Sequence, residues 1–296
     1  MDLFLNRCFD ALSNGSAYAL IAMALVMIFK ATTLINFAQG EMAMFGAFVV
    51  MVMANEWGLP AWIAVVGGMI FMAVVGAGIE RTLIRPFDPS DHLPLVIVTL
   101  GLFLGINALA GIIWRFDPRS FPQLYPSGNA LTIGGATLSW YTVGVVVTVV
   151  AVAALLTLLL NKTKVGLAFR AVSSNLESSQ LVGIRVGPTL QFGWALAAAV
   201  GTLGAAVFVA DPIRALEPSV MVRVLIFAAS AAALGGLDSL WGAIVGGICI
   251  GAVQSIIVPY TPIPNELSLA AAVVVLMLVL LFKPSGLFGT AQVERV

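Results

Sequence analysis

The stretch 161–188 reads NKTKVGLAFRAVSSNLESSQLVGIRVGP and is the most polar long run in a sequence of 296 residues. Apolar runs long enough to span a membrane flank it on both sides. We therefore expect this stretch to lie at one membrane surface, between two helices that return into the lipid.

Two short helices are expected within this stretch. Residues 166–172 can form about two helical turns. Ser174 lies three residues before Glu177, a spacing typical of a capping box at the start of a second helix. Gly183 is placed to end that helix in a left-handed conformation. Two interpretations are open here, namely a rigid element that docks a cytoplasmic partner, and a solvated loop that carries the basic residues of the cytoplasmic side.

The composition indicates a polytopic membrane protein. Hydrophobic residues make up 60% of the sequence and charged residues only 9%, whereas a soluble domain carries about 25% charged residues. We expect an all-α fold in a single domain, residues 1–296, with about eight or nine transmembrane helices. The expected spans are 12–29, 34–54, 60–84, 93–114, 140–160, 189–210, 220–234, 240–258 and 267–282.

Basic residues set the expected orientation. If 161–188 is cytoplasmic and nine helices cross the membrane, nine of the 14 basic residues lie inside, as the positive-inside rule requires. The residues expected inside are Lys30, Arg81, Arg85, Lys162, Lys164, Arg170, Arg185, Lys283 and Arg295. The residues expected outside are Arg7, Arg115, Arg119, Arg214 and Arg223. The N-terminus is then outside and the C-terminus inside.

Four polar residues at membrane depth are candidates for a substrate pathway: Asn36, Gln39, Glu41 and Asn107. Glu41 is the only carboxylate clearly inside an apolar run, and ionisable groups there are costly and usually functional. The alternative is that Glu41 caps the second span at the inner interface, where it still meets water. Asn36 and Gln39 are three residues apart, as on one face of a helix. For Asn107 the alternative is an interhelical hydrogen bond.

Glycines in the eighth span indicate close helix packing. Gly242, Gly246, Gly247 and Gly251 form two overlapping GxxxG spacings. Small residues of this kind let helix backbones approach closely in lipid.

Several function classes are excluded. The sequence contains no GxxxxGK[ST] motif, so this chain does not hold ATP in the usual way. Its one histidine, His92, is expected in a turn and cannot complete a catalytic set or a metal site. A net charge of zero argues against nucleic acid as a partner. Neither an enzyme nor a metal site is expected. A passive solute channel and an ion-coupled carrier remain as rival transport classes.

Several segments in the same order resemble the permease subunits of branched-chain amino acid ABC importers. The matching segments are NGSAYALIA at 14–22, INFAQGE at 35–41, Gly46-Ala47, 166–184, Gly235-Gly236 with Gly242-Ala243, and FKPSGLFG at 282–289. The chain has Gln39 where the family commonly has His. It has Glu177-Ser178-Ser179 where Glu-Ala-Ala is more usual. The resemblance spans essentially the whole chain.

This resemblance implies a transport function and a set of partners. The chain would import branched-chain or other hydrophobic amino acids across a bacterial inner membrane. Its partners would be a second, related permease chain, two cytoplasmic ATPase subunits that bind ATP and Mg, and a periplasmic substrate-binding protein. No cofactor is expected in this chain itself. Because the wider family includes permeases for urea and short amides, such cargo is the alternative.

The resemblance also assigns a role to the polar stretch. Residues 166–184 look like the family's ATPase-docking loop. The residues expected to dock are Gly166, Arg170, Glu177, Leu181 and Gly183. Leu181 would insert into the ATPase, and the charged pair would lie at the rim of the contact.

Overall fold

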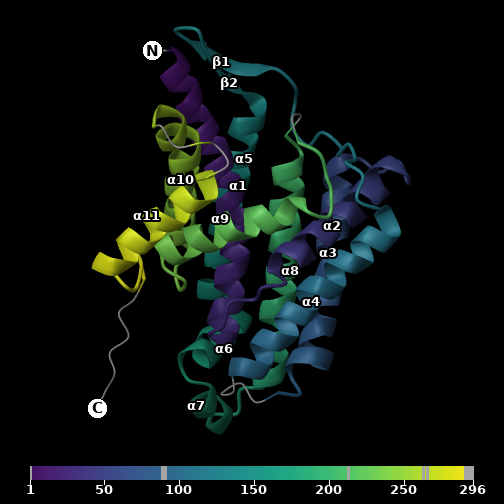
Figure 1. Cartoon of the computed structure of the whole chain (residues 1–296). Coiled ribbons are helices and arrows are strands. Elements are labelled where there is room, and N and C mark those ends of the chain that lie inside the picture. Colours follow the sequence, from purple (N-terminus) through teal and green to yellow (C-terminus); the bar gives the residue numbers. More distant parts are fainter. Residues whose placement is uncertain (1, 88–91, 212–213, 262–263, 265–266, 290–296) are drawn as a thin grey trace.

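The computed structural model describes residues 2–87, 92–211, 214–261, 264 and 267–289. Most of these residues lie in helices (Figure 1). The α-helices are α1 (Asp2–Thr32), α2 (Gln39–Asn55), α3 (Ala61–Ile79), α4 (His92–Trp114), α5 (Trp140–Lys162), α6 (Lys164–Ser174), α7 (Leu176–Leu181), α8 (Val186–Val209), α9 (Val220–Gly235), α10 (Leu240–Ala252) and α11 (Ser268–Phe282). The π-helical segment η1 (Glu80–Ile84) continues α3, and η2 (Val253–Ile257) and the 3-10 helix η3 (Val258–Tyr260) continue α10.

Six helical segments in the described part of the chain are long and apolar enough to cross a membrane. They are Asp2–Thr32, Ala61–Ile84, Leu93–Trp114, Trp140–Lys162, Val186–Val209 and Leu240–Tyr260. The chain is therefore a multi-pass membrane protein. Helices form at all nine expected positions, but α2, α9 and α11 have only 17, 16 and 15 residues. These lengths fall short of the roughly 20 residues that a span requires, so the expected eight or nine spans are not confirmed.

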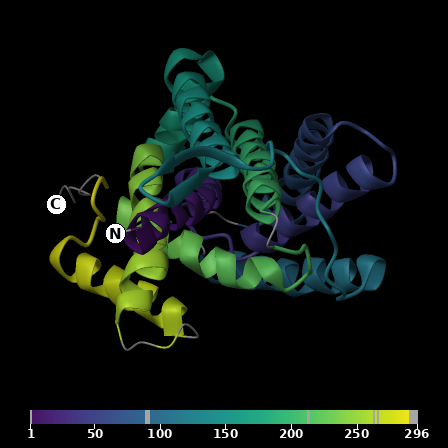
Figure 2. The ribbon, with the colours of Figure 1, turned by 90° about the horizontal axis from the view of Figure 1, so that it is seen from above.

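Helix α1 lies at the centre of the bundle. Of the 18-residue apolar segment in each helix, 83% of the residues are buried in α1 and in α8, but only 11% in α4. Seen from above, α1 lies among α5, α8, α9 and α10, while α3 and α4 lie to one side (Figure 2). The exposed apolar surface of α4 is typical of a helix that faces lipid, where water does not penalise it.

Close packing of α10 rests on its glycines, as predicted. A Cβ atom added at Gly15 of α1 would lie 2.7 Å from the backbone oxygen of Gly247. A Cβ atom at Gly246 would collide with the backbone oxygen of Ala231 in α9. Helices α1, α9 and α10 therefore meet through their backbones, which lets dispersion contacts hold them together in lipid.

A two-stranded antiparallel sheet departs from the expected all-α fold. Strand β1 (Asn129–Ile133) pairs with β2 (Ala136–Ser139). Gly134 and Gly135 connect the strands with φ of +56° and +88°, as a type I′ turn requires. The hairpin lies beside the N-terminal end of α1, where the Thr137 amide donates to Asn6 Oδ1 at 3.0 Å.

Two local expectations are wrong. The second span was expected from residue 34, but residues 33–38 are not helical and α2 begins only at Gln39. Apolar side chains at Leu34, Ile35 and Phe37 keep the hydropathy of this break high, so composition alone does not reveal it. His92 is the first residue of α4 rather than a turn residue, and its side chain lies outside the described part. Arg295, expected inside, also lies outside the described residues.

Candidate functional site

The break between α1 and α2 buries its polar residue Asn36 and leads into the buried start of α2. The Gln39 side chain at the start of α2 donates through Nε2 to the Ala197 carbonyl, 3.1 Å away and midway along α8. Asn36 precedes the helix, and its Oδ1 accepts the Ala38 amide at 3.0 Å. Asn36 and Gln39 therefore do not share a helical face, contrary to the sequence-based expectation, because Asn36 forms an Asx turn instead.

Glu41 and Asn107 join three parts of the chain. The Asn107 Nδ2 of α4 donates to Glu41 Oε2 and to the Pro218 carbonyl, each at 3.0 Å. The prediction of an interhelical hydrogen bond at Asn107 is confirmed. Glu41 is 0% exposed, and the residue at the start of α2, Ala38, makes no side-chain capping bond. Glu41 therefore does not act as a water-exposed cap at the inner interface, because packing of α2, α4 and α8 removes it from water.

The carboxylate of Glu41 is only partly satisfied. Among the residues that the structure describes, its Oε1 and the Oε1 of Gln39 have no hydrogen-bond partner. No basic side chain of the described part forms an ion pair with Glu41. A buried acidic group without a cation costs free energy of folding. The unpaired oxygens of Glu41 and Gln39 therefore make this cluster energetically unfavourable.

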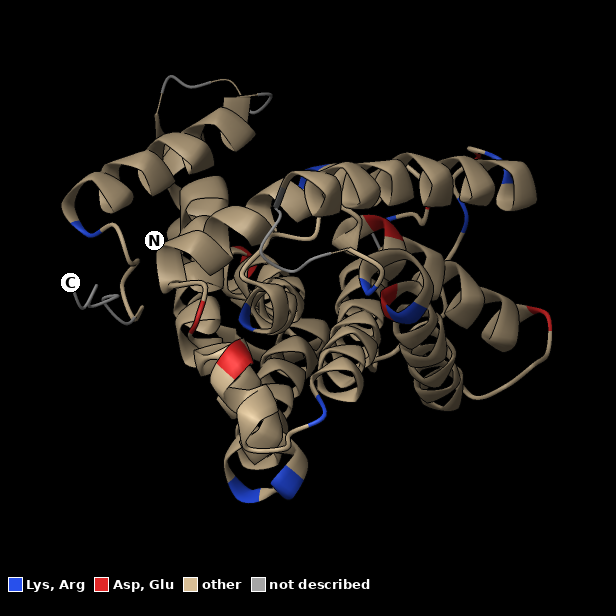
Figure 3. Ribbon diagram, turned by 90° about the horizontal axis from the view of Figure 1, so that it is seen from below, with Lys and Arg blue, Asp and Glu red and all other residues tan. Residues whose placement is uncertain are grey.

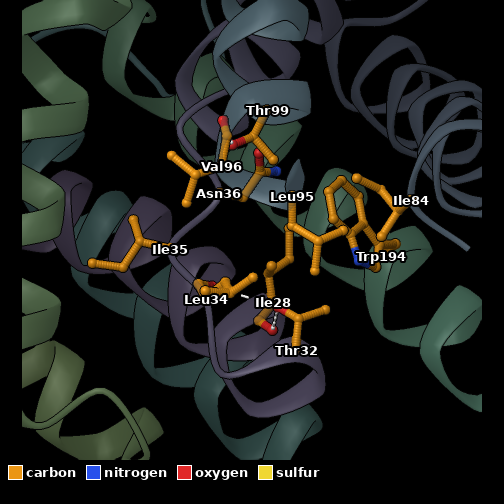
Figure 4. A pocket seen from close by; sticks show the side chains of 10 residues that line it. All are labelled: Ile28, Thr32, Leu34, Ile35, Asn36, Ile84, Leu95, Val96, Thr99 and Trp194. Atoms are coloured by element: carbon orange, nitrogen blue, oxygen red, sulfur yellow. Dashed lines mark hydrogen bonds between the residues drawn. The ribbon is translucent and has the colours of Figure 1, made fainter. Parts of the chain in front are cut away.

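A small cavity lies beside Asn36, between residues of α1, η1, α4 and α8 (Figure 4). Its lining is mostly apolar and comprises Ile28, Thr32, Leu34, Ile35, Asn36, Ile84, Leu95, Val96, Thr99 and Trp194. Its volume is about 10 Å³, which is about enough for one water molecule. It adjoins a larger cavity of about 680 Å³ beside α7, with which it shares Thr32, Ile84 and Leu95.

A second polar cluster lies nearer the N-terminal end of α1, around Arg214. This arginine donates to Asn14 Oδ1 and to the Phe208 carbonyl, and lies 3.5 Å from Asp211. Open pockets of about 550 and 840 Å³ meet at Asn14 and Arg214. The sequence analysis did not select these residues, although Asn14 and Tyr18 are four residues apart on α1 and so share a face.

The polar stretch forms the two predicted helices, α6 and α7, at the end of the bundle opposite the N-terminus and the β-hairpin (Figure 1). Seen from this end, most charged residues lie at helix ends and in connections (Figure 3). Thr163 caps α6 by accepting the Gly166 amide at 3.0 Å. The cap of α7 is Asn175, whose Oδ1 accepts the Ser178 amide at 2.7 Å. The expected capping box at Ser174 is therefore wrong by one residue. Gly183 has φ of +81°, which confirms the left-handed end.

The α6–α7 elbow, residues 163–185, presents an apolar tip. Leu181 is 88% exposed and Val182 is 76% exposed. Arg170 and Glu177 are also exposed. Gly166 instead lies against α5, where a Cβ atom would collide with the Leu159 carbonyl. Gly166 thus lets α6 approach α5 rather than offering a surface.

An ion pair between the exposed Arg85 and the buried Glu80 joins the helices above the elbow. Arg85 donates to Glu80 at 2.6 Å and to the Gly187 carbonyl at 3.1 Å. Gln191 of α8 accepts from Arg85 at 3.2 Å and donates to the Ala77 carbonyl at 3.1 Å. The elbow runs directly into α8, so these bonds connect it with α3 and η1.

The chain is similar to known transport permeases. Residues 8–281 match the family described as branched-chain amino acid transport system, permease component. The chain is 28% identical to the high-affinity branched-chain amino acid transport system permease protein LivH of Escherichia coli K12, over 99% of this chain and 98% of that protein. It is 28% identical to the corresponding protein BraD of Pseudomonas aeruginosa, with the same coverage. A probable branched-chain amino acid transport permease protein of Methanocaldococcus jannaschii is 30% identical, over 84% of this chain and 80% of its own length.

Proposed function

Since the chain belongs to the family of branched-chain amino acid transport permease components, we propose that it is the membrane-spanning permease subunit of an ATP-driven importer. Its cargo is branched-chain or other hydrophobic amino acids, the cargo named for its relatives. The chain is not an enzyme and holds no cofactor of its own. ATP and Mg bind to separate ATPase subunits.

The elbow is the observation that carries this proposal. A leucine exposed to 88% beside a valine exposed to 76% is costly at a water-facing surface, and a passive channel has no need of it. Covering this tip with an ATPase subunit removes the apolar surface from water. The firmly capped helices α6 and α7 then transmit ATPase movement to α5 and α8.

The elbow faces the cytoplasm in this proposal, with the N-terminus outside and the C-terminus inside. Nine helices enter the membrane, and the short helices α2 and α9 begin at its middle rather than at its surface. Transporters commonly place discontinuous helices of this kind around their substrate pathway. The polar groups of Asn36, Gln39, Glu41 and Asn107 lie along that pathway, as the sequence indicated.

Open pockets lie at both ends of the bundle, as a pathway with alternating access requires. Cavities of about 550 and 840 Å³ lie on the side of the N-terminus, and a cavity of about 680 Å³ lies beside the elbow, where Leu176, Glu177 and Gln180 line it. ATP binding draws the ATPase subunits together and favours one access state over the other. The ATPases bias this equilibrium only if their two states bind the elbow with different affinity.

The complete importer also contains a second, related permease chain and a periplasmic protein that delivers the cargo. The exposed apolar faces of the bundle meet lipid and the second permease in a bacterial inner membrane. The whole of residues 1–296 acts as one permease domain.

Reconstitution in vesicles tests this function. We expect leucine uptake only when this chain is combined with the second permease, both ATPases, the binding protein and ATP. Uptake by vesicles that contain this chain alone would support a passive channel instead. Uptake that requires an ion gradient rather than ATP would support an ion-coupled carrier. Either result would overturn the proposal.

A further inference from the structure

We propose that the open pocket beside Arg214 and Arg223 binds the α-carboxylate, the α-ammonium group and the aliphatic side chain of an amino acid on its way through this chain. This inference rests on the proposed importer function and assigns a cargo-binding site within it. The site differs from the buried carboxylate of Glu41, which lines neither this pocket nor the one that adjoins it.

The pocket is large enough for a free amino acid. Its volume is about 840 Å³, within the range of about 300–1,000 Å³ typical of small-molecule sites. It opens on the outer side, between α1, α9 and η2. A second pocket of about 720 Å³ adjoins it and shares Asn14, Arg223 and Gln254.

Two arginines make one side of the pocket positive. Arg214 is held in place by Asn14, the Phe208 carbonyl and Asp211, and its side chain keeps 20% exposure. Arg223 is exposed on α9, and no described residue forms an ion pair with it. A guanidinium group binds a carboxylate through two parallel hydrogen bonds. Arg223 is therefore placed to receive the α-carboxylate, with Arg214 as a fixed neighbouring charge.

An acidic group faces the same pocket. Glu217 is half-buried in the segment before α9, and its Oε1 accepts a hydrogen bond from Ser219 at 2.7 Å. This bond orients the carboxylate at the rim. A carboxylate and a guanidinium group in one pocket match the two opposite charges of a zwitterion, and neutral urea has neither charge.

The remaining wall is apolar. Phe208, Val220, Val224 and Phe227 line it, and the Tyr18 ring stacks on Phe227 with 5.1 Å between ring centroids. An aliphatic side chain lying on this wall leaves water. The pocket therefore combines guanidinium groups, a carboxylate and an apolar surface, which match the carboxylate, the ammonium group and the side chain of a leucine-like molecule.

The π-helical segment η2 completes the pocket. Gln254 and Ser255 of η2 bond to α1, where Tyr18 donates to Gln254 at 2.6 Å and Asn14 donates to Ser255 at 3.1 Å. A π-helical turn is rarely favourable by itself and often marks a functional site. Here it turns two consecutive polar side chains toward α1 at the edge of the pocket.

Binding to the complete importer without its periplasmic protein tests the site. Isothermal titration would compare leucine with leucinamide, which lacks the carboxylate, and with 4-methylpentanoic acid, which lacks the ammonium group. We expect each analogue to bind about tenfold more weakly than leucine, because each loses one charge-assisted pair. Arg223→Gln should abolish the preference for leucine over leucinamide, and Arg223→Lys should keep part of that preference. Glu217→Gln should abolish the preference for leucine over 4-methylpentanoic acid. Arg115→Gln, which removes an arginine that lines no pocket, should change nothing.

Two results would overturn the site. One is equal affinity for leucine and leucinamide in the unmodified importer. The other is that the Arg223→Gln importer keeps its preference for leucine over leucinamide, as the Arg115→Gln control does. ATP-dependent leucine uptake by the same preparation separates this failure from failure of the proposed function. Uptake with no charge preference rejects only the site, whereas absence of ATP-dependent uptake rejects the importer itself.

Discussion

Replacing Asn107 by leucine should destabilise the bundle more than any change that keeps its hydrogen-bond partners satisfied. Asn107 donates to Glu41 Oε2 and to the Pro218 carbonyl, so Asn107→Leu leaves both acceptors unpaired. Interhelical hydrogen bonds in membranes are worth about 0.6–1.7 kcal/mol each. The loss of two should lower the free energy of unfolding by about 2 kcal/mol.

The other members of a double-mutant cycle sharpen this prediction. Glu41→Gln keeps an oxygen that accepts from Asn107, so its unfolding free energy should stay within about 0.5 kcal/mol of the original chain. Combining Glu41→Leu with Asn107→Leu removes the unpaired carboxylate and should restore about half of the loss. Ala108→Leu places the same leucine on the exposed side of α4 and is the matched control.

Unfolding in bicelles measures these differences. A cost below about 0.5 kcal/mol for Asn107→Leu, or an equal cost for Glu41→Gln, would refute the reasoning from hydrogen bonds. Leucine uptake by Glu41→Gln then separates the roles of the carboxylate. Reduced uptake at unchanged stability would place Glu41 on the pathway. Unchanged uptake would mean that Glu41 serves only to link the helices through its hydrogen bond with Asn107.

Two glycine substitutions give further tests. Gly246→Val should cost about 1–3 kcal/mol of unfolding free energy in bicelles, because its side chain meets the Ala231 backbone. Gly105→Val, in open space on α4, should leave the unfolding free energy unchanged. Equal effects of the two substitutions would contradict the close packing of α9 and α10. Gly183→Ala should slow leucine uptake at unchanged membrane level, because a φ of +81° costs a residue with a Cβ about 1–2 kcal/mol. Gly78→Ala is its control. Equal uptake rates in the two variants would show that uptake does not depend on the left-handed helix end at Gly183.

The positions of the helices follow from the sequence because lipid demands long apolar runs. Helix α5 begins at Trp140 and α9 begins at Val220, both as predicted. The two helices of the elbow could also be predicted from the sequence, because a glycine at a left-handed position and polar capping residues are local signals. The capping residue itself was missed by one position, because serine and asparagine side chains can both accept backbone amides and only the helix boundary in the structure shows that Asn175 does so.

The break between α1 and α2 and the pocket around Arg214 lie beyond what local patterns encode. Residues 33–38 are rich in apolar side chains, yet they are not helical, and Gln39 directly after them bonds to α8. The pocket joins α1, the segment before α9, and η2, which are far apart in the sequence. Its π-helical turn depends on contacts with α1, and no periodicity of single residues predicts such a turn.

The central claim is that an ATPase subunit covers the tip of the elbow. Burying the Leu181 side chain contributes about 2 kcal/mol, so Leu181→Ala should weaken binding of the purified ATPase subunits about 30-fold. Stability of the isolated permease should not change, because Leu181 is 88% exposed there. Leu155→Ala, which trims a 65% exposed leucine on α5, should leave the affinity intact. The decisive measurement is the dissociation constant of the ATPase subunits for the two variants in lipid nanodiscs. A roughly 30-fold loss for Leu181→Ala alone is predicted, and equal affinity for both variants would contradict the account.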